Sequence, residues 1–268
     1  MVLTVEGSRK GQISVQVLRA AFEGSDPALI DHYVRPDYIQ HNPLAADGPE
    51  AMKAFAAAWQ QQFPEATYEE KRVITEGDLV ILQSHGVLVP GTPGLTVFDI
   101  FRFQDGKIAE HWDILQEVPA TTANGNDTFS TLSLPKIEGP SQRQYTAYNK
   151  KLVTDYIHQV LVLKDLTAVD TYTGSEYHEH SPDRPDGVAG VKIGLAAYFE
   201  RSPQASVTPK RVIAEGDLVA VQSHYVDTPG ERGRAVIDLF RVRDGKIVEH
   251  WGASQDVPET SANNNTMF

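Results

Sequence analysis

Apolar residues recur at helical spacing near the start of the chain and again in its second half. The first set is Ile13, Val17, Leu18 and Ala21, and the second is Leu152, Val153, Tyr156, Ile157, Val160 and Leu161. A spacing of three to four residues places such side chains on one face of a helix. Each half of the chain is therefore predicted to begin with an amphipathic helix.

The rest of the first half predicts two more helices and then strands. A short helix is expected around Pro27–Tyr33, and a third begins after DGP at 47–49 and continues to about Phe63. Turn signals then separate four predicted strands: Thr67–Thr75, Leu79–Val89, Thr96–Phe103 and Lys107–Gln116. We predict an α+β fold, a cone of three helices on one face of a curved antiparallel sheet that encloses a pocket.

The second half of the chain repeats the first at a constant offset of 139 residues. YIQHNP at 38–43 corresponds to YHEHSP at 177–182, and EHW at 110–112 recurs at 249–251. A period of this length is the size of a whole small domain. We predict two tandem cone-shaped domains, 1–130 and 142–268, joined by a linker at 131–141 that carries two prolines and a glycine. The two copies are expected to form an intrachain pseudo-dimer.

Composition and charge narrow the range of functions. The 268 residues include 24 Lys plus Arg against 36 Asp plus Glu, a formal net charge of −12. Such an acidic surface repels phosphate and anionic lipid, so neither nucleic acid nor a membrane is expected as a partner. The chain has no cysteine, which excludes disulfides, thiolate metal sites and cysteine nucleophiles. Because its start lacks the apolar segment of a signal peptide, we expect a cytoplasmic location.

The faces of the last two strands depend on the hairpin at Asp105–Gly106. A two-residue loop pairs Gln104 with Lys107, whereas a three-residue loop with a bulge at the glycine pairs Phe103 with Lys107. The difference of one residue moves a whole strand to the other face.

We favour the three-residue loop because it lets Arg102 and Glu110 pair on one face. It predicts a first face with Asp99, Phe101, Phe103, Ala109, His111, Asp113 and Leu115. The opposite face then carries Phe98, Ile100, Arg102, Ile108, Glu110, Trp112 and Ile114. One face is expected to line the pocket and the other to meet the sheet of the second copy.

Carboxylates beside imidazoles in an apolar pocket suit proton transfer. Burial raises the pKa of a carboxyl group, and a neighbouring histidine can hold or relay the proton. The catalytic candidates are Asp99, His111, Asp113, His85 and His41 in the first copy, and Asp238, His250, His224 and His180 in the second. Aromatic side chains are the expected substrate contacts: Phe101, Phe103, Trp59 and Tyr38, then Phe240, Tyr198 and Tyr177. The loop at 90–95 leaves the register of His85 open.

A structural interpretation stands beside each candidate. The Asp99–His111 pair can serve only to satisfy internal polar groups, His85 can be a core histidine, and His41 can brace its loop. Trp112 and Trp251 are more typical of an interface core than of a ligand platform. The Asn-rich tails, 123–129 and 262–268, are either loose ends or, as their ungapped repetition weakly suggests, segments that dock, for example against the pocket of the other copy.

At this point a family resemblance is evident. The string DIFRFQDGKIAEHWD at 99–113, with QHNP at 40–43, resembles the SnoaL-like proteins. These are polyketide-cyclase-related members of the nuclear-transport-factor-2-like superfamily and are associated with aldol condensation. The likeness covers about Tyr38–Pro119 and Tyr177–Pro258.

The resemblance implies a cofactor-free pocket in which an aspartate is the general acid/base and a histidine assists. The EHWD motif carries these roles to His111 and Asp113, and the preceding strand adds Asp99. The second copy departs from the motif, because Gly252 stands where Asp113 would be. If Asp113 is the base, only the first copy is catalytic by that route. If Asp99 is the base, both copies can be.

Three functions compete. The leading one is a small-molecule enzyme that acts at or next to a carbonyl by aldol-type cyclisation, isomerisation or a related lyase or hydrolase step. The second is a non-catalytic binding protein with the same pocket. The third is a metal enzyme with a site of His41, His85, His111 and Asp99, although no HisXXXHis ligand pair is present. The expected partner is a carbonyl-containing small molecule, with no cofactor; a further homo-oligomer is left open.

Overall fold

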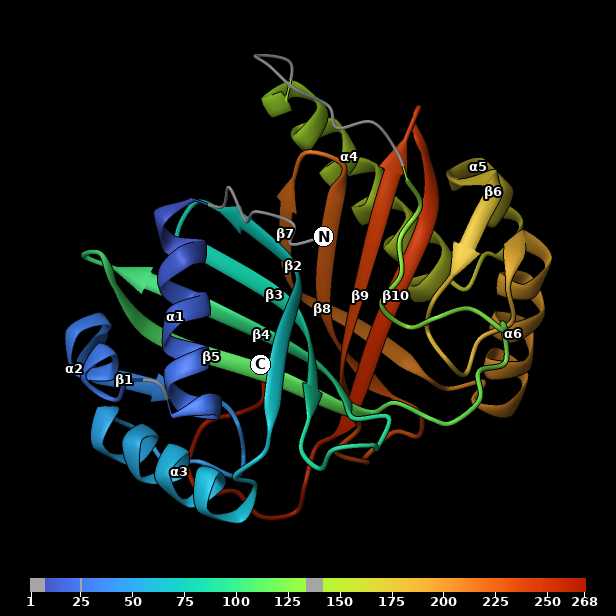
Figure 1. Cartoon of the computed structure of the whole chain (residues 1–268). Coiled ribbons are helices and arrows are strands. Elements are labelled where there is room, and N and C mark those ends of the chain that lie inside the picture. Colours follow the sequence, from blue (N-terminus) through green and yellow to red (C-terminus); the bar gives the residue numbers. More distant parts are fainter. Residues whose placement is uncertain (1–7, 25, 134–141) are drawn as a thin grey trace. The chain divides into compact units, whose positions relative to one another are not determined.

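The computed structural model describes residues 8–24, 26–133 and 142–268. Its contacts divide the chain into two compact units (Figure 1). Unit 1 holds the described residues up to Glu117 together with Pro258–Phe268, and unit 2 holds those of Val118–Val257. The tail that follows each repeat therefore belongs to the unit built from the other repeat. Most of the predicted linker, residues 134–141, lies outside the described residues.

Three helices form in unit 1 where the apolar spacing predicts them: α1 Arg9–Glu23, α2 Ala28–Tyr33 and α3 Pro49–Gln62. Ser8 caps α1 by accepting the amide hydrogen of Gly11 at 3.2 Å. Gly24 ends α1 in the left-handed conformation, with φ 68°, which glycine adopts without steric cost. The proline that begins α3 lacks only a donor that the first helical turn would leave unpaired.

The sheet of unit 1 has five strands in the order β1-β5-β4-β3-β2. Four of them match the prediction: β2 Thr67–Glu76, β3 Leu79–Val87, β4 Leu95–Gln104 and β5 Lys107–Glu117. The fifth, β1 Val34–Gln40, pairs in parallel with β5. The predicted purely antiparallel sheet is therefore corrected to a mixed one. The sequence of β1, VRPDYIQ, does not predict a strand, because a proline and two charged residues interrupt the apolar alternation.

The hairpin between β4 and β5 corrects the predicted register. Gln104 pairs with Lys107 across a two-residue loop. Asp105 and Gly106 have φ values of 53° and 79°, the positive values that a type I′ turn requires at both positions.

A bulge in β5 nevertheless restores most of the predicted faces. Ala109 is an extra residue in the strand, and beyond it Asp99 lies opposite Asp113. Moving the extra residue from the loop to the strand preserves the alternation beyond it. The first face therefore has its predicted members there: Asp99, Phe101, His111, Asp113 and Leu115. Ile108 is the exception, because it pairs with Phe103 and shares this face.

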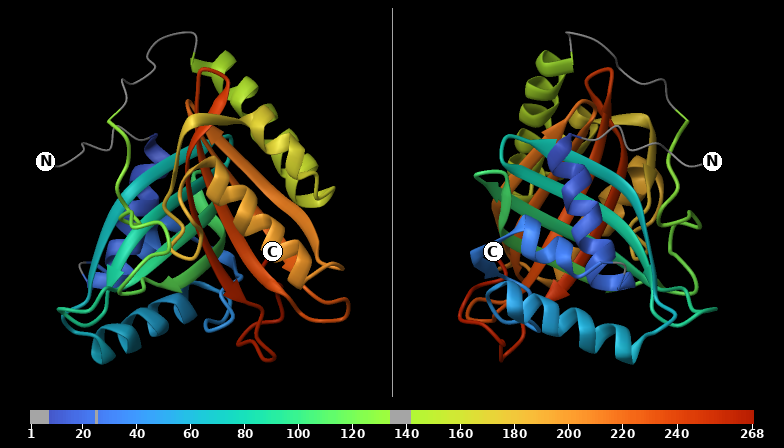
Figure 2. Two further views of the ribbon diagram at one scale, coloured as in Figure 1. Left: turned by 90° about the vertical axis from the view of Figure 1, so that its right-hand side faces the viewer. Right: turned by 60° about the vertical axis from the view of Figure 1, so that its left-hand side comes forward.

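The helices cover this same face. One core cluster joins residues of α1 and α3 to residues of the sheet: Ile13, Val17, Leu18, Met52, Ala56, Phe101, Phe103 and Ile108. Figures 1 and 2 show α1 lying across the sheet of unit 1. The candidate chemistry is therefore on the side of the sheet that helices shield from water.

Unit 2 repeats the plan with a sheet in the order β6-β10-β9-β8-β7. Its strands are β6 Thr173–Glu179, β7 Ser206–Glu215, β8 Leu218–Val226, β9 Arg234–Arg243 and β10 Lys246–Asp256. Its helices are α4 Gln142–Tyr156, the π-helix η1 Ile157–Val162, the short η2 Leu166–Ala168 and α5 Val169–Tyr172, and α6 Gly187–Arg201. Among the described residues, no helix is long and apolar enough to cross a membrane.

Candidate active site

A buried aspartate and histidine from β4 and β5 form the centre of the site. Asp99 Oδ1 and His111 Nε2 are 3.0 Å apart, and the two residues are only 1% and 6% exposed. The imidazole stacks on the ring of Phe101, its cross-strand partner, with centroids 4.6 Å apart. The structure thus brings the predicted pair together on the helix-covered face.

Tyr68 in β2 completes the environment of Asp99. Its hydroxyl donates to Asp99 Oδ2 at 2.5 Å, and its ring stacks on Phe22 with centroids 5.1 Å apart. Burial, together with the charge of Asp99, raises the pKa of Tyr68 well above its ordinary value. The phenol therefore remains a donor. No motif in the sequence predicts Tyr68 as a residue of the site.

The turn after β1 determines where His111 carries its hydrogen. Gln40 Oε1 lies 3.0 Å from His111 Nδ1 and also accepts the amide of Asn42 at 2.9 Å. A backbone amide can only donate, so the Gln40 oxygen faces His111 and Nδ1 must be protonated. His111 Nε2 is then directed at Asp99 Oδ1.

His111 holds its proton more tightly than an ordinary histidine. Burial acts to lower the pKa of His111, but the hydrogen bond to Asp99 and the charge of Asp113 outweigh it, and the pKa is raised. The imidazole is thus biased towards the charged form beside two carboxyl groups.

Asp113 differs from Asp99 in having one carboxyl oxygen without a hydrogen-bond partner among the described residues. Asn42 Nδ2 donates to its Oδ2 at 2.6 Å, but its Oδ1 is buried without a hydrogen-bond partner among the described residues. Burial, the largest effect, and the charge of Asp99 raise its pKa from 3.8 to about 6, against the lowering effect of His111. A carboxyl group with these properties can accept and return a proton near neutral pH.

The same three residues could also hold a metal ion. Asp99, His111 and Asp113 each offer a ligand atom, and these atoms lie within 4.8 Å of one another. Two carboxylates and an imidazole suit several divalent ions. The predicted ligand set of His41, His85 and His111 is not brought together.

His41 lies on the opposite side of the sheet from the pair. Its ring stacks on Trp112 with centroids 4.6 Å apart, and its Nε2 is 2.8 Å from Glu110 Oε1. Trp112 and Glu110 alternate with His111 along β5 and therefore point away from the site. His41 braces the turn before α3, which was the structural alternative.

His85 is also on the opposite face. Leu82 lies opposite Asp99 in the β3–β4 ladder, whereas His85 lies opposite Thr96. The Nε2 atom of His85 is 2.8 Å from the carbonyl oxygen of Pro93. The prediction that His85 joins the Asp99 face is wrong, because that prediction required a register that the loop at 90–95 does not impose.

The second unit retains the Asp–His pair, but a carboxyl group lies at each ring nitrogen of its histidine. His250 Nε2 is 2.9 Å from Asp238 Oδ1, and its Nδ1 is 2.7 Å from Glu179 Oε1, where the first unit has Gln40. Burial opposes ionisation of all three groups. Their mutual charges and hydrogen bonds nevertheless raise the pKa of His250 and lower the pKa values of Glu179 and Asp238. A charged imidazole is therefore held between two carboxylates.

Two further substitutions separate the second site from the first. Arg184 replaces Ala45 and places its Nη2 3.4 Å from Asp238 Oδ1. Gly252 replaces Asp113, and a Cβ there would lie 2.7 Å from Ser181 Oγ. The second site therefore has neither an acid equivalent to Asp113 nor room for one without a shift of Ser181.

The tyrosine that donates to the aspartate changes strand between the units. Tyr68 pairs across the ladder with Gly86 in unit 1, and Val207 pairs with Tyr225 in unit 2. The Tyr225 hydroxyl reaches Asp238 Oδ2 at 3.2 Å. Both units therefore supply a phenol to the central aspartate, but from different members of one cross-strand pair.

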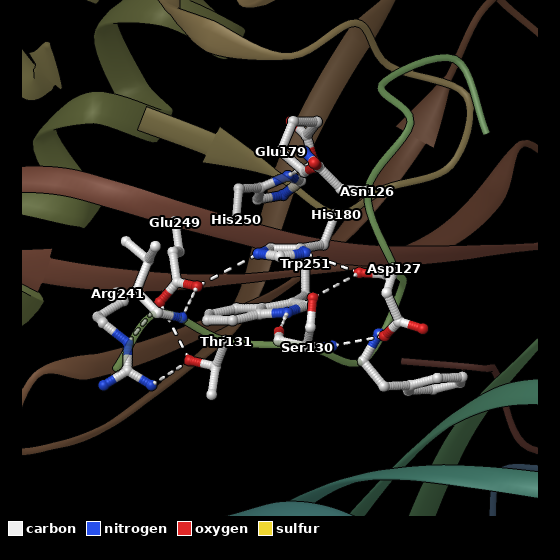
Figure 3. Close-up of polar contacts among 12 residues, drawn as sticks. Asn126, Asp127, Ser130, Thr131, Glu179, His180, Arg241, Glu249, His250 and Trp251 are labelled. Carbon is white, nitrogen blue, oxygen red and sulfur yellow. Dashed lines mark hydrogen bonds and ion pairs between the residues drawn. The ribbon is translucent and has the colours of Figure 1, made fainter. Parts of the chain in front are cut away.

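His180 and His224 repeat the placements of His41 and His85. His180 stacks on Trp251 with centroids 5.0 Å apart and lies 3.2 Å from Glu249 Oε1 (Figure 3). His224 Nε2 is 2.8 Å from the carbonyl oxygen of Arg232. Neither residue reaches the Asp238–His250 pair.

Most of the first-copy aromatic residues predicted to contact substrate pack in the core of unit 1. Phe103 and Tyr38 belong to the core cluster of unit 1, and Tyr38 Oη accepts from Gln40 at 2.9 Å. Trp59 packs in a group of rings with Phe22 and Phe55. Of these four aromatic side chains, Phe101 is the one that stacks on the imidazole of the site, as far as the described residues show.

The second-copy aromatics lie nearer to charged groups. Phe240 packs against His250 at a centroid distance of 4.8 Å, and Tyr177 donates to Glu179 at 2.9 Å. Tyr198 donates to Asp227 at 2.7 Å. Substrate contact by any of the seven aromatic residues stays a prediction.

Unit 2 also has a cavity of about 420 Å³. Its lining is charged and includes Tyr225, Asp227, Glu231, Arg232, Arg234 and Asp256. The guanidinium of Arg234 lies 5.6 Å from the ring centroids of both Tyr198 and Tyr225. The cavity thus adjoins the tyrosine that bonds to Asp238.

A helix-covered mixed sheet with a buried Asp–His pair, present twice, defines a class of small α+β domains. The family model of the SnoaL-like polyketide cyclases matches residues 12–124, and a SnoaL-like domain model matches 153–250. The chain belongs to the SnoaL-like proteins and contains two such domains in tandem. A comparison with curated proteins finds no match.

Similar solved structures each match 40–41% of this chain. TsrD from Streptomyces laurentii is 27% identical over 41% of this chain and 91% of its own, with a TM-score of 0.35. Wild-type IdmH from Streptomyces antibioticus is 21% identical over 40% and 92%, with a TM-score of 0.33. An uncharacterized cystatin-fold protein from Novosphingobium aromaticivorans is 18% identical over 40% and 99%, with a TM-score of 0.35.

Proposed function

We propose that the first domain is a small-molecule enzyme that transfers a proton at a carbon next to a carbonyl, without a cofactor. The reaction class is aldol-type cyclisation, isomerisation or a related lyase or hydrolase step. The observation that supports the proposal is Asp113: its Oδ1 is buried with no hydrogen-bond partner among the described residues, and its pKa is raised to about 6.

In this proposal Asp113 is the general base. Its carboxylate removes the proton from the carbon, and negative charge develops on the carbonyl oxygen. The imidazolium of His111, whose Nε2 lies 3.0 Å from Asp99 Oδ1, supplies positive charge near that oxygen and stabilises the enolate. Asp113 then returns its proton to the product, so that the site ends in its starting state.

The second domain supports a different role. Its imidazole is enclosed by Glu179 and Asp238, and Gly252 leaves it without a base equivalent to Asp113. The cavity of about 420 Å³ beside Tyr225 favours small-molecule binding without chemistry as a second candidate function, confined to this domain.

Hydrogen exchange at carbon tests the proposal without knowledge of the natural substrate. The chain is incubated in D₂O with a panel of β-keto esters, and deuterium incorporation next to the carbonyl is followed by NMR. We expect Asp113→Asn to slow the catalysed exchange by about 100-fold or more. Asp105→Asn, in the exposed hairpin turn, is the matched control and should leave the rate unchanged.

Equal exchange rates for the parent and Asp113→Asn would overturn the proposal. Elemental analysis of the purified chain separates it from the metal alternative. One equivalent of a transition metal that is lost in Asp113→Asn would assign the three side chains to metal binding instead.

A further inference from the structure

We propose that the C-terminal tail, Pro258–Phe268, positions the site of the first domain, although it follows the second domain in sequence. The tail belongs to unit 1, and it has no helix or strand of its own. An effect of the tail on catalysis rests on the proposed function. The contact between the tail and the site rests on hydrogen bonds alone.

Two asparagines of the tail bind the backbone of one turn. Asn263 Nδ2 donates to the carbonyl oxygens of Asn42 and Ala45, each at 2.8 Å. Asn265 Nδ2 donates to the carbonyl oxygen of Gln40 at 2.9 Å and to Asp47 Oδ1 at 2.8 Å. Both donor hydrogens of each amide are therefore used.

The tail backbone adds two more contacts to the same turn. The amide of Ala262 donates to the carbonyl of Pro43 at 2.7 Å, and His41 Nδ1 donates to the carbonyl of Thr266. Carbonyl groups of an irregular turn have no ladder partner and need donors from elsewhere. The tail supplies those donors to the carbonyls of residues 40, 42, 43 and 45.

This turn contacts two of the side chains that the proposed reaction uses, His111 and Asp113. The side chain of Gln40 accepts from His111 Nδ1, and the side chain of Asn42 donates to Asp113 Oδ2. A displacement of the turn would withdraw both contacts together. The tail therefore acts on the site through Gln40 and Asn42.

The other tail makes the same contacts in unit 2. Asn124 Nδ2 donates to the carbonyls of Ser181 and Arg184 at 2.7 and 3.0 Å, and Asn126 Nδ2 donates to the carbonyl of Glu179 at 2.9 Å. Figure 3 shows Asn126 beside Glu179, and the following Asp127 beside His180. The recurrence at matched positions indicates that the AlaAsnXAsn segment recognises this turn specifically.

The test measures the titration of Asp113 in the full chain by ¹³C NMR of carboxyl-labelled aspartate, with Asp113→Asn assigning the signal. The variant is Asn263→Ala, and Asn124→Ala is its matched control in the other tail. Because loss of the Asn42 hydrogen bond removes an influence that lowers the pKa of Asp113, we expect its midpoint to rise by about half a pH unit or more in Asn263→Ala. The control should leave the midpoint unchanged.

A second measurement keeps the test decisive if Asn263→Ala folds poorly. In Asn265→Ala, we expect the amide of Asn42, which donates to Gln40, to exchange about tenfold faster with solvent than in the matched variant Asn126→Ala. An unchanged Asp113 midpoint with unchanged exchange at Asn42 would overturn the role of the tail. A parent midpoint near 4 would instead overturn the proposed base, whichever way the tail variants behave.

Discussion

Each site has a second carboxyl group besides the central aspartate, but the two sites place it on different sides of the imidazole. In the first site it is Asp113, two residues after the histidine on β5; in the second it is Glu179, at the position of Gln40. The pKa of Asp113 is raised to about 6, whereas that of Glu179 is lowered despite its burial. The same number of carboxyl groups therefore produces a group ready to exchange a proton in one site and a closed ion pair in the other.

The raised pKa of Asp113 predicts a pH-dependent change in stability. A group with a higher pKa in the folded chain binds its proton more tightly there, so the free energy of unfolding falls as the pH rises from about 4 to about 6. Above this window the ionised carboxyl costs up to about 3 kcal/mol. We expect Asp113→Asn to be the more stable chain near pH 8 and to lose this advantage near pH 4, as measured by urea unfolding.

The raised pKa of His111 changes stability in the same direction, because the folded chain again binds the proton more tightly. Its contribution to stability is present at low pH and is lost as the pH rises through the folded-state pKa. Because the charge of Asp113 helps to raise that pKa, the variant should lose the His111 contribution at a lower pH than the parent does. A difference between parent and Asp113→Asn that stays constant from about pH 4 to about pH 8 would contradict both assignments.

The two phenol contacts predict unequal effects of removing a hydroxyl group. Tyr68→Phe leaves a buried oxygen of Asp99 without its donor, and we expect a loss of about 1–3 kcal/mol in the free energy of unfolding. Tyr225→Phe removes a longer contact, 3.2 Å, from an aspartate that keeps His250 and Arg184 as partners. We expect a smaller loss there; equal losses in urea unfolding would show that the additional partners do not compensate.

The central residues of the site were predictable because alternation along a strand is a local property. Asp99, His111 and Asp113 share a face under either placement of the extra residue in the hairpin. Tyr68, Gln40 and Asn42 were not predicted, because their positions depend on which strands pair. The motif QHNP contains Gln40 and Asn42, but only the parallel pairing of β1 with β5 places them beside His111 and Asp113.

At the scale of elements, the loop between β3 and β4 decides which face His85 occupies. Gly91 and Gly94 both lie in this loop with positive φ, 83° and 80°. A Cβ at Gly91 would meet nothing within 4 Å, whereas one at Gly94 would clash with the carbonyl oxygen of Gly86. The two glycines therefore share a backbone conformation but differ in the space around them.

This difference predicts separate outcomes for two neighbouring substitutions. Gly91→Ala should cost about 1 kcal/mol, because only the left-handed backbone disfavours alanine. Gly94→Ala should cost about 3 kcal/mol or more, because the backbone of Gly86 belongs to a paired strand and cannot move aside. Thermal unfolding of the two variants measures this difference. Equal shifts of the unfolding midpoint would show that the loop moves enough to relieve the clash at Gly94.

Helices and antiparallel strands were predicted from periodicity and turn residues, and most of their bounds agree with the structure to within two residues. The parallel strand β1 was missed, because Arg35, Pro36 and Asp37 break its alternation. The sequence predicts the bulge at Gly106 in the loop, whereas the structure has it at Ala109 in β5. The two positions cannot be told apart from the pattern, because both give the same alternation of faces from Glu110 onwards. Local pattern thus determines the elements, whereas non-local pairing determines the register.

At the scale of the whole molecule, the exchange of tails joins the two repeats more firmly than the linker alone would. Each tail belongs to the unit formed by the other repeat. We expect two co-expressed fragments, 1–133 and 142–268, to elute together in gel filtration, because each fragment carries the tail that the other binds. Fragments that end at Glu117 and Val257 are the matched pair without tails and should associate less. Separate elution of the tailed fragments would contradict the exchange.

The crossed tails also constrain how such a gene can change. A deletion that discarded the second repeat, whose own site has Gly252 in place of the acid, would discard Asn263 and Asn265 as well. A surviving single copy would then need to dock its own Asn-X-Asn segment or borrow one from a neighbouring chain. Loss of the half without the acid would therefore also remove the donors that the carbonyls of residues 40, 42 and 45 accept from, which makes the duplication difficult to reverse in a single step.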